Sequence, residues 1–471
     1  MASKWRFWLA DRFGTKPIEQ AVLRRRVART PWYYGDGATL FMLFGVLVVT
    51  GAFMTLTYSP SPDSAYASVK YITEHQRLGW FVRGLHYWSA GLMTVMLFFH
   101  FFRVLLVAGY KFPREGTYLV GVFLFFGVLT MSFTGYLLRW DERSIYAIQV
   151  VLHMFHRVPW IGESLVLLVQ GGAEPGAMTL TRLYSIHILL VPILLGGLVL
   201  FHLYLVILHG VTSRPERERP IHTAEEQKKL YKETAASKEG GEDFYPNTAA
   251  ASGAMALVVL SVAVLLTLVV GPRELMPEAN LVDRSFPAEE WWFWWYSALI
   301  ALLPSAVAPA FVVVFPLVVF VLMVLLPFVD RGPHRGFRKR PLMVGFVIVS
   351  VLLLLLLTDL RRTSSWTAWP DPTLPPVPEA IGLTEQAEEG RQLYVEYGCN
   401  SCHAVAGVGR RVGPDLATVG DRYSRAQFRE WILEPPGDVA MPSYEGRLSE
   451  QQLERIIDFI MATQTFPRRV R

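Results

Sequence analysis

Long apolar stretches alternate with shorter polar connections along the first 360 residues of the chain. Seven stretches reach the roughly 20 residues that a helix needs to cross about 30 Å of hydrocarbon. They are residues 39–58, 85–107, 118–138, 183–208, 251–270, 302–328 and 342–360. The pattern predicts an all-α, polytopic membrane bundle of seven transmembrane helices, followed by a small soluble domain that is also all-α.

Polar and proline-rich intervals divide the chain into five expected parts. Residues 1–210 hold the first four spans and residues 248–360 hold the last three. Between them, residues 211–247 are rich in Lys and Glu and predict a cytoplasmic linker. Residues 361–379 include five prolines, which favour an extended and semi-rigid spacer. Residues 380–471 form the predicted soluble domain.

Composition supports a membrane protein. Hydrophobic residues make up 52% of the chain and charged residues only 18%, which is too little polar surface for a soluble domain of this length. The net charge of +5 could indicate nucleic-acid binding, but the basic residues lie in short clusters between apolar spans. These clusters are typical of a membrane-topology signal, and no nucleic-acid partner is expected.

The distribution of basic residues predicts the orientation in the membrane. The connection between the last two spans carries five, namely Arg331, Arg335, Arg338, Lys339 and Arg340. The preceding connection, residues 271–292, carries two basic residues against five acidic ones. The first connection is therefore expected in the cytoplasm. Seven spans then place the N-terminus inside and the soluble domain outside, as in a bacterial inner membrane. The charged first 30 residues predict no cleavable signal, so the first span is expected to direct insertion.

Both cysteines, Cys399 and Cys402, lie in "CNSCH", directly before His403. This is the attachment signature of a c-type haem, in which the thiols bond to the macrocycle and the histidine ligates iron. The alternatives are a disulfide, a thioredoxin-type pair or half a zinc site, although zinc needs further ligands and no other histidine follows residue 334. Met441 is expected as the second iron ligand, whereas Met461 lies on the apolar face of the last predicted helix. His/Met ligation raises the potential of a haem, so this domain is expected to accept electrons from the membrane part.

Four histidines lie inside predicted spans, where an ionisable residue usually has a function. His86 and His100 are 14 residues apart, and His187 and His202 are 15 apart, so each pair lies near one face of its helix. Two such helices could clamp two haems. Glycines in the first and third spans repeat the 14-residue spacing and could let a flat macrocycle approach the backbone; they are Gly37, Gly51, Gly121 and Gly135. Ordinary polar contacts and helix packing are the alternatives.

Several motifs resemble known families. "RGLHYWSA", "HFFRV", "KFPRE", "TLTRLYSIH" and "FHLYL" resemble cytochrome b of the quinol-oxidising bc and bf complexes, in particular the chloroplast-type protein together with its three-helix subunit IV. "GCNSCH", "GPDL" and "MPSY" resemble class I cytochromes c. The resemblance implies one haem c and two b haems, an outer one held by His86 and His187 and an inner one held by His100 and His202. Arg83 and Arg103 would face haem propionates, with snorkelling arginines as the alternative.

The loop "FPAEEWWFWW" is similar to the Pro-Glu-Trp-Tyr motif of the quinol-oxidation site in that family. Glu290 and Trp291 keep the central pair, and the family assigns the glutamate to accepting a quinol proton. Glu289 stands in place of the proline and its role is open, while Trp292 replaces the tyrosine. A carboxylate in a desolvated site beside a second carboxylate is expected to have a raised pKa. Membrane anchoring by an interfacial Glu and Trp is the alternative.

The resemblance also implies partners and a reaction. The family oxidises quinol with bifurcated electron transfer to a Rieske iron-sulfur subunit and to the b haems, coupled to proton translocation. No cysteine remains to hold a cluster, so a separate Rieske subunit is expected, together with an electron acceptor and a homodimer in the lipid bilayer. The alternative is a membrane-anchored b/c electron carrier that serves a dehydrogenase or reductase without bifurcation.

Two departures from the chloroplast-type protein concern the inner side. That protein attaches an extra haem through a cysteine near the start of its first span, but "WYYGDG" contains none, which excludes covalent attachment there. An arginine that follows the last haem ligand in that protein is also absent. His209 is therefore a candidate proton-handling group for an inner quinone site, with a helix-end histidine as the alternative.

Overall fold

The computed structural model is mostly helical. It describes residues 8, 10–12, 20, 23–172, 175–212, 223–237, 240–278, 289–304, 307–332, 334–363, 374–375, 377, 382–405, 408–409, 413–418, 422–435, 441 and 443–463. Within these ranges the strands form two short antiparallel pairs. They are β1 (Arg26–Ala28) with β2 (Gly241–Asp243), and β3 (Ala404–Val405) with β4 (Val408–Gly409).

The seven predicted membrane spans are confirmed as helices long and apolar enough to cross a bilayer. They are α3 (Asp36–Thr55), α5 (Gly79–Leu106), α6 (Glu115–Leu137), the continuous pair α9 (Ala177–Ser185) and α10 (Val191–His209), α12 (Ala249–Val269), α14 (Ala308–Val329) and α15 (Pro341–Thr363). The fourth span begins earlier than predicted. Its two helices are joined by a π-helical turn at Ile186–Leu190.

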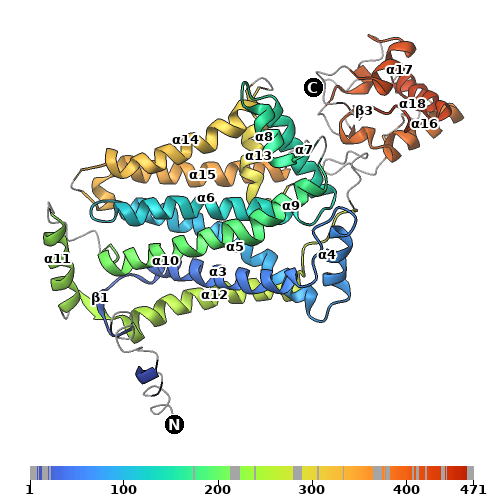
Figure 1. Cartoon of the computed structure of the whole chain (residues 1–471). Coiled ribbons are helices and arrows are strands. Elements are labelled where there is room, and N and C mark those ends of the chain that lie inside the picture. Colours follow the sequence, from blue (N-terminus) through green and yellow to red (C-terminus); the bar gives the residue numbers. More distant parts are fainter. Residues whose placement is uncertain are drawn as a thin grey trace. The chain divides into compact units, whose positions relative to one another are not determined.

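These helices lie side by side in Figure 1. The helix α3 packs along α5, and α6 packs along α10, so the four histidine- and glycine-bearing spans form two helix pairs. The helix α12 packs against α3 and α5, while α14 packs against α6. A buried apolar cluster that includes Leu43, Leu97 and Phe125 joins α3, α5 and α6, and Met323 and Val347 extend it to α14 and α15.

The N-terminal segment and the linker between the two membrane parts meet at one small sheet. Strand β1 pairs with β2 in the register Arg26 with Asp243 and Ala28 with Gly241. The described part of the linker also contains α11 (Ala224–Ala236), whose N-cap Thr223 accepts a hydrogen bond from the amide of Glu226. This cap satisfies a donor that the first helical turn leaves free.

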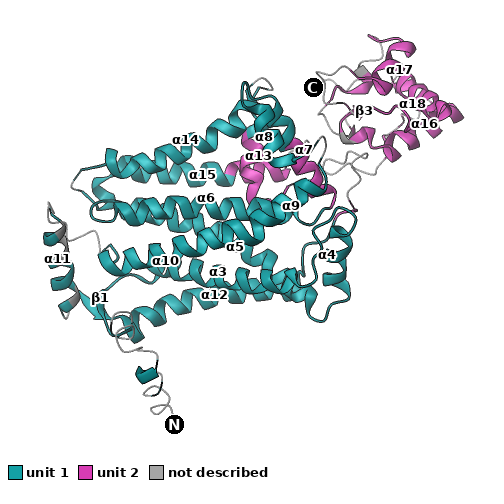
Figure 2. Cartoon of the chain, viewed as in Figure 1, with its two compact units in different colours: residues 1–140, 151–275, 300–355 teal, residues 141–150, 276–299, 356–471 magenta. Residues whose placement is uncertain are grey.

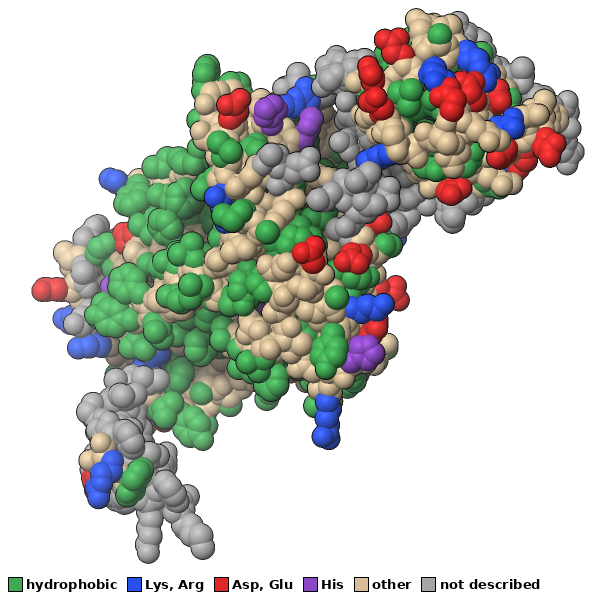
Figure 3. Space-filling model, turned by 45° about the vertical axis from the view of Figure 1, so that its right-hand side comes forward, with side chains coloured by type: hydrophobic (Ala, Val, Ile, Leu, Met, Phe, Trp, Pro, Cys, Tyr) green, Lys and Arg blue, Asp and Glu red, His purple; other side chains and the backbone are tan. Residues whose placement is uncertain are grey.

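The chain divides into two compact units, coloured separately in Figure 2. One comprises residues 1–140, 151–275 and 300–355 and holds most of the membrane helices. Figure 3 shows hydrophobic side chains over much of its visible face. Leu194 on α10 and Val329 on α14 are among the exposed apolar side chains. Because a soluble protein rarely exposes so much apolar surface, this face is suited to lipid.

The second unit comprises residues 141–150, 276–299 and 356–471. Near its start is the first part of α7 (Glu142–His156), and it includes most of α13 (Trp294–Ala301). Its C-terminal part contains α16 (Glu385–Glu396), α17 (Arg425–Leu433) and α18 (Glu450–Ala462). The helices α16 and α18 cross closely at Gly390, where an added Cβ would lie 1.8 Å from the carbonyl oxygen of Arg455. Two shorter helices, α4 (Ala65–Glu74) and α8 (Gly162–Gln170), belong to the first unit.

Candidate functional site

The first candidate centre is a pair of facing imidazoles. His86 comes from α5, and His187 comes from the π-helical turn before α10; their ring centroids are 6.5 Å apart. Pro192 follows that turn and has no N–H to donate to the preceding turn, a local reason for the helix to widen there. Because metal–imidazole bonds are about 2 Å long, the separation leaves room for one metal ion between the two rings.

Threonine hydroxyls orient both rings. Thr50 Oγ1 lies 2.9 Å from His86 Nδ1 and donates its own proton to the carbonyl of Val46 at 2.7 Å. Thr134 Oγ1 lies 3.1 Å from His187 Nδ1 and donates to the carbonyl of Thr130. Since each hydroxyl proton is already used, each Nδ1 carries the proton and donates. Each Nε2 is thereby left with its lone pair free for a metal.

Every one of the four histidines packs against one of the four predicted glycines. A Cβ added at Gly51 would lie 3.4 Å from Cε1 of His86, and one at Gly135 would lie 2.6 Å from Cε1 of His187. The corresponding separations are 3.6 Å for Gly37 and His100 and 3.4 Å for Gly121 and His202. The glycines of α3 and α6 therefore make the space in which the imidazoles of α5 and α10 lie.

His100, the second histidine of α5, has a charged neighbour. Asp36, which is fully buried at the start of α3, lies 3.1 Å from His100 Nδ1. Arg103 binds the same carboxylate with two contacts of 2.8 Å, and its guanidinium lies over the ring of Tyr34. Arg103, predicted to face a propionate, thus lies against a carboxylate of the protein itself. The other predicted arginine, Arg83, is buried and donates to the carbonyl of Arg273.

These observations fit haem between paired histidines. Among the described residues, no group of three or more His, Cys, Asp or Glu side chains could hold a metal ion. A structural zinc site needs four ligands. Two facing imidazoles with free Nε2 atoms and glycine-lined surroundings instead match the two axial ligands of a flat macrocycle.

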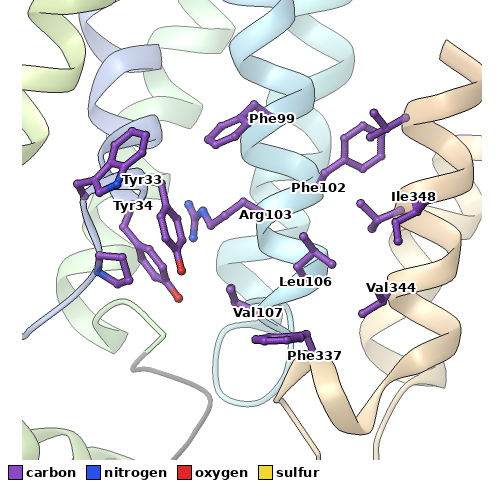
Figure 4. A pocket seen from close by; sticks show the side chains of 14 residues that line it. Tyr33, Tyr34, Phe99, Phe102, Arg103, Leu106, Val107, Phe337, Val344 and Ile348 are labelled. Carbon is purple, nitrogen blue, oxygen red and sulfur yellow. The ribbon is translucent and has the colours of Figure 1, made fainter. Parts of the chain in front are cut away.

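A cavity of about 850 Å³ is lined by residues near the end of α5, among them Phe99 and Arg103. Figure 4 shows Tyr33 and Tyr34 on one side, Phe99, Phe102 and Arg103 in the middle, and residues of α15 on the other. The lining is mainly apolar and aromatic, with one guanidinium, as in pockets that bind small organic molecules.

His209 lies at the end of α10, where its carbonyl and that of Gly210 accept hydrogen bonds from the guanidinium of Arg114.

Glu290 is fully buried just before the turn Trp291–Phe293. Its carboxylate lies 3.4 Å from the guanidinium of Arg143 on α7. The neighbouring Glu289 turns instead to Arg361, near the end of α15. The two adjacent carboxylates therefore have different cationic partners.

In the C-terminal part, His403 follows a 3-10 turn at Cys399–Ser401. Its Nδ1 donates to the carbonyl of Pro414 at 2.9 Å, which again leaves Nε2 free. Gly413 is required beside it, because a Cβ there would lie 2.5 Å from Cε1 of the ring. Met441 packs against the same apolar cluster as Cys399.

Cys399 and Cys402 are not joined by a disulfide in this structure. Burial, together with the neighbouring Cys402, raises the pKa of Cys399 to about 12. A reactive thiol has a lowered pKa, and the shift at Cys399 is in the opposite direction.

Sequence reasoning did not identify Asp36, Thr50, Thr134, Arg143 or Arg361. The threonines each stand one residue before a predicted glycine, at 50 and 51 and at 134 and 135. This repeated Thr-Gly pair is the sequence feature from which the two threonines could have been identified. The two arginines have partners 72 or more residues away, and no local pattern reveals such contacts.

Comparisons with known proteins agree with this geometry. The family model described as cytochrome b/b6/petB matches residues 26–211, and the model described as cytochrome c oxidase, cbb3-type, subunit III matches residues 385–460. Cytochrome b6 of Porphyra purpurea is 38% identical over 209 residues, which are 44% of this chain and 96% of that protein. Cytochrome b6 of Synechocystis sp. is 35% identical over 207 residues, 44% of this chain and 93% of that protein. A structure titled "Hyperthermophilic respiratory Complex III" matches with a TM-score of 0.66 and 26% identity, covering 76% of this chain and 91% of that one.

Proposed function

The chain belongs to the cytochrome b/b6 family and carries a C-terminal cytochrome c domain, and from this premise we propose that it is the combined b and c subunit of a bc-type complex. The proposed reaction is oxidation of membrane quinol at the outer side. One electron passes to a separate Rieske subunit, and the other crosses the membrane to reduce quinone at the inner side. Protons are released outside and taken up inside.

The facing histidine pair is the observation that carries this proposal. His86 and His187 would hold an outer b haem, and His100 and His202 an inner one, each ring lying against its own glycine. Cys399, Cys402, His403 and Met441 would hold a covalent haem c. When bound, these groups supply one-electron transfer across the membrane and out to an acceptor.

At the outer side, Glu290 is the proposed proton acceptor. Its carboxylate is buried, so a proton taken from quinol would be held away from bulk water. Arg143, 3.4 Å away, would orient the carboxylate. Trp291 follows directly in the chain and would form part of the quinol pocket. These roles rest on the burial and the ion pair, together with the likeness of the loop.

At the inner side, the cavity beside Arg103 is the proposed quinone site. Its aromatic walls suit a ring, and its guanidinium can donate to a carbonyl oxygen of that ring. Because basic residues are concentrated between α14 and α15, this end of the bundle is proposed to face the cytoplasm. The C-terminal domain is then proposed to lie on the outer side of a bacterial inner membrane, and a homodimer is proposed from the family.

A haem count and a turnover assay on the purified complex test the proposal. We expect two b haems and one c haem per chain by pyridine haemochrome, and a Rieske subunit that copurifies. Glu290→Gln should lower quinol oxidation by on the order of a hundredfold with the haems retained. A one-way carrier would instead reduce its haems from a dehydrogenase in the absence of any Rieske protein. One c haem without b haem would exclude both readings of the membrane part.

A further inference from the structure

The carboxylate of Glu289 makes several polar contacts within its own part of the chain. Its two carboxylate oxygens each lie 2.9 Å from a nitrogen of the Arg361 guanidinium, one at Nε and one at Nη2. The hydroxyl of Ser297 also donates to this carboxylate. The Arg361 side chain is 8% exposed and that of Glu289 18% exposed, so water hardly screens the pair. Such two-point contacts are the strongest class of charged hydrogen bonds.

The backbone is tied down at the same place. The indole of Trp294 on α13 donates to the carbonyl of Glu289 at 3.1 Å. Glu290 has extended backbone angles, so its side chain points away from that of Glu289 and towards Arg143. Glu289 therefore anchors the segment to Arg361 on α15, while the carboxylate of Glu290 lies near Arg143 on α7.

We propose that Glu289 and Arg361 are positioning residues that hold the Glu290–Trp291 segment in its quinol-binding geometry. This inference rests on the proposed function of Glu290. A carboxylate with both oxygens bound to one guanidinium, and with a hydroxyl donor besides, is poorly placed to receive a proton from quinol. Glu289 is therefore assigned to holding the loop, and Glu290 alone to the proton.

The expected kinetic effect depends on the fraction of molecules in which the Glu290–Trp291 segment has its quinol-binding conformation, here called the competent form. If the ion pair is removed, the segment populates other conformations, and the apparent quinol affinity falls by the fraction that remains competent. Saturating quinol restores the competent form. We therefore expect Glu289→Gln to raise KM for quinol roughly tenfold with kcat changed less than about twofold, and to leave the shape of the pH–rate profile unaltered.

The test is a double-mutant cycle in the complete complex, with haem content verified for each variant. Glu289→Gln, Arg361→Gln and the double variant should raise KM equally, because the second change removes nothing further. Arg361→Lys, which cannot make the two-point contact, should be intermediate. Arg362→Gln is the matched control, since its ion pair with Asp359 is exposed and should not affect KM.

Hydrogen exchange over residues 289–299 provides a readout that is independent of turnover. All three variants of the cycle should raise exchange there to the same extent. A lowered kcat with one limb of the pH profile lost in Glu289→Gln, but not in Arg361→Gln, would make Glu289 a proton acceptor and overturn the assignment, as would unchanged exchange. If Glu290→Gln keeps full turnover, the proposed function of the loop fails, whereas the exchange data still decide whether the pair holds the segment.

Discussion

The imidazole rings of His86 and His187 lie edge to face, with centroids 6.5 Å apart and planes inclined by 69°. They come from helices whose sequences are separated by about 100 residues. The rings do not stack on each other, and each is held by a threonine and a glycine of a neighbouring helix, His86 by α3 and His187 by α6.

Gly135 is the tightest of the four glycine contacts. A methyl group there would lie 2.6 Å from Cε1 of His187, so Gly135→Ala must displace the ring. We expect the purified variant to lose about half of its b haem while keeping its c haem. Gly37→Ala is the control, because its methyl would lie 3.6 Å from His100, an ordinary contact. Equal loss in both variants by pyridine haemochrome would contradict the packing argument.

Thr50 is expected to tune the outer haem through His86. Thr50→Val removes the acceptor for Nδ1–H, which makes the imidazole a weaker donor to iron and raises the midpoint potential by on the order of tens of millivolts. Redox titration of the b haems measures this shift. Thr50→Ser keeps the hydroxyl and should therefore keep the original midpoint potential. Thr55→Val, whose hydroxyl donates to the carbonyl of Ala52 at the end of the same helix, should leave both b potentials unchanged. An unshifted outer potential in Thr50→Val would show that the hydroxyl does not set the basicity of the ring.

The crossing of α16 and α18 depends on Gly390. A Cβ at that position would lie 1.8 Å from a backbone oxygen, which no side-chain rearrangement can relieve. We expect Gly390→Ala to destabilise the C-terminal domain by about 2–3 kcal/mol or to prevent its folding. Thermal unfolding followed by c-haem absorbance measures this. Gly382→Ala, with nothing within 4 Å of its Cβ, is the control and should unfold like the original protein.

Asp330 links the loops that follow α5 and α14. Its carboxylate binds Lys111 at 2.7 Å and Arg340 at 3.0 Å. Burial acts to raise the pKa of Asp330, but the hydrogen bonds from Lys111 and Tyr110 and the charges of Lys111 and Arg340 outweigh it, so the pKa lies below its ordinary value.

A carboxyl with a lowered folded-state pKa stabilises the protein above its unfolded-state pKa of about 3.9 and loses this contribution as the pH falls through the folded value. We therefore expect the unfolding temperature of the membrane part to decrease when the pH is lowered beneath about 4. Asp330→Asn should be less stable than the original protein at pH 7, and its unfolding temperature should decrease less on acidification. Asp359→Asn, from an exposed ion pair, is the control. If acidification lowered the unfolding temperature equally in the original protein and in Asp330→Asn, Asp330 would not be the group responsible.

Sequence periodicity was sufficient for the architecture and insufficient for the charged contacts. Seven apolar runs predicted seven membrane helices because a bilayer requires long uninterrupted apolar segments. The 14- and 15-residue spacings placed His86 with His100, and His187 with His202, near one face of each helix because helix geometry fixes which residues share a face. The pairing of His86 with His187 across two helices came from the resemblance to cytochrome b and not from the spacing. Asp36 with Arg103 and Glu289 with Arg361 could not be predicted, because each pair depends on the relative rotation of separate helices, which no local pattern determines.

The contact of Lys111 with Asp330 bears on why the two membrane parts share one polypeptide. The buried Lys111 and the partly buried Asp330 already join them through an ion pair, so covalent continuity through the linker is not the only contact between them. A single chain additionally fixes the ratio of the two parts at one to one. Each four-helix part enters the membrane with its own three-helix part, at an effective concentration that separately translated halves would reach only by diffusion. The fusion therefore governs how often the two parts meet and in what ratio, while the ion pairs of Asp330 with Lys111 and Arg340 help to hold them together.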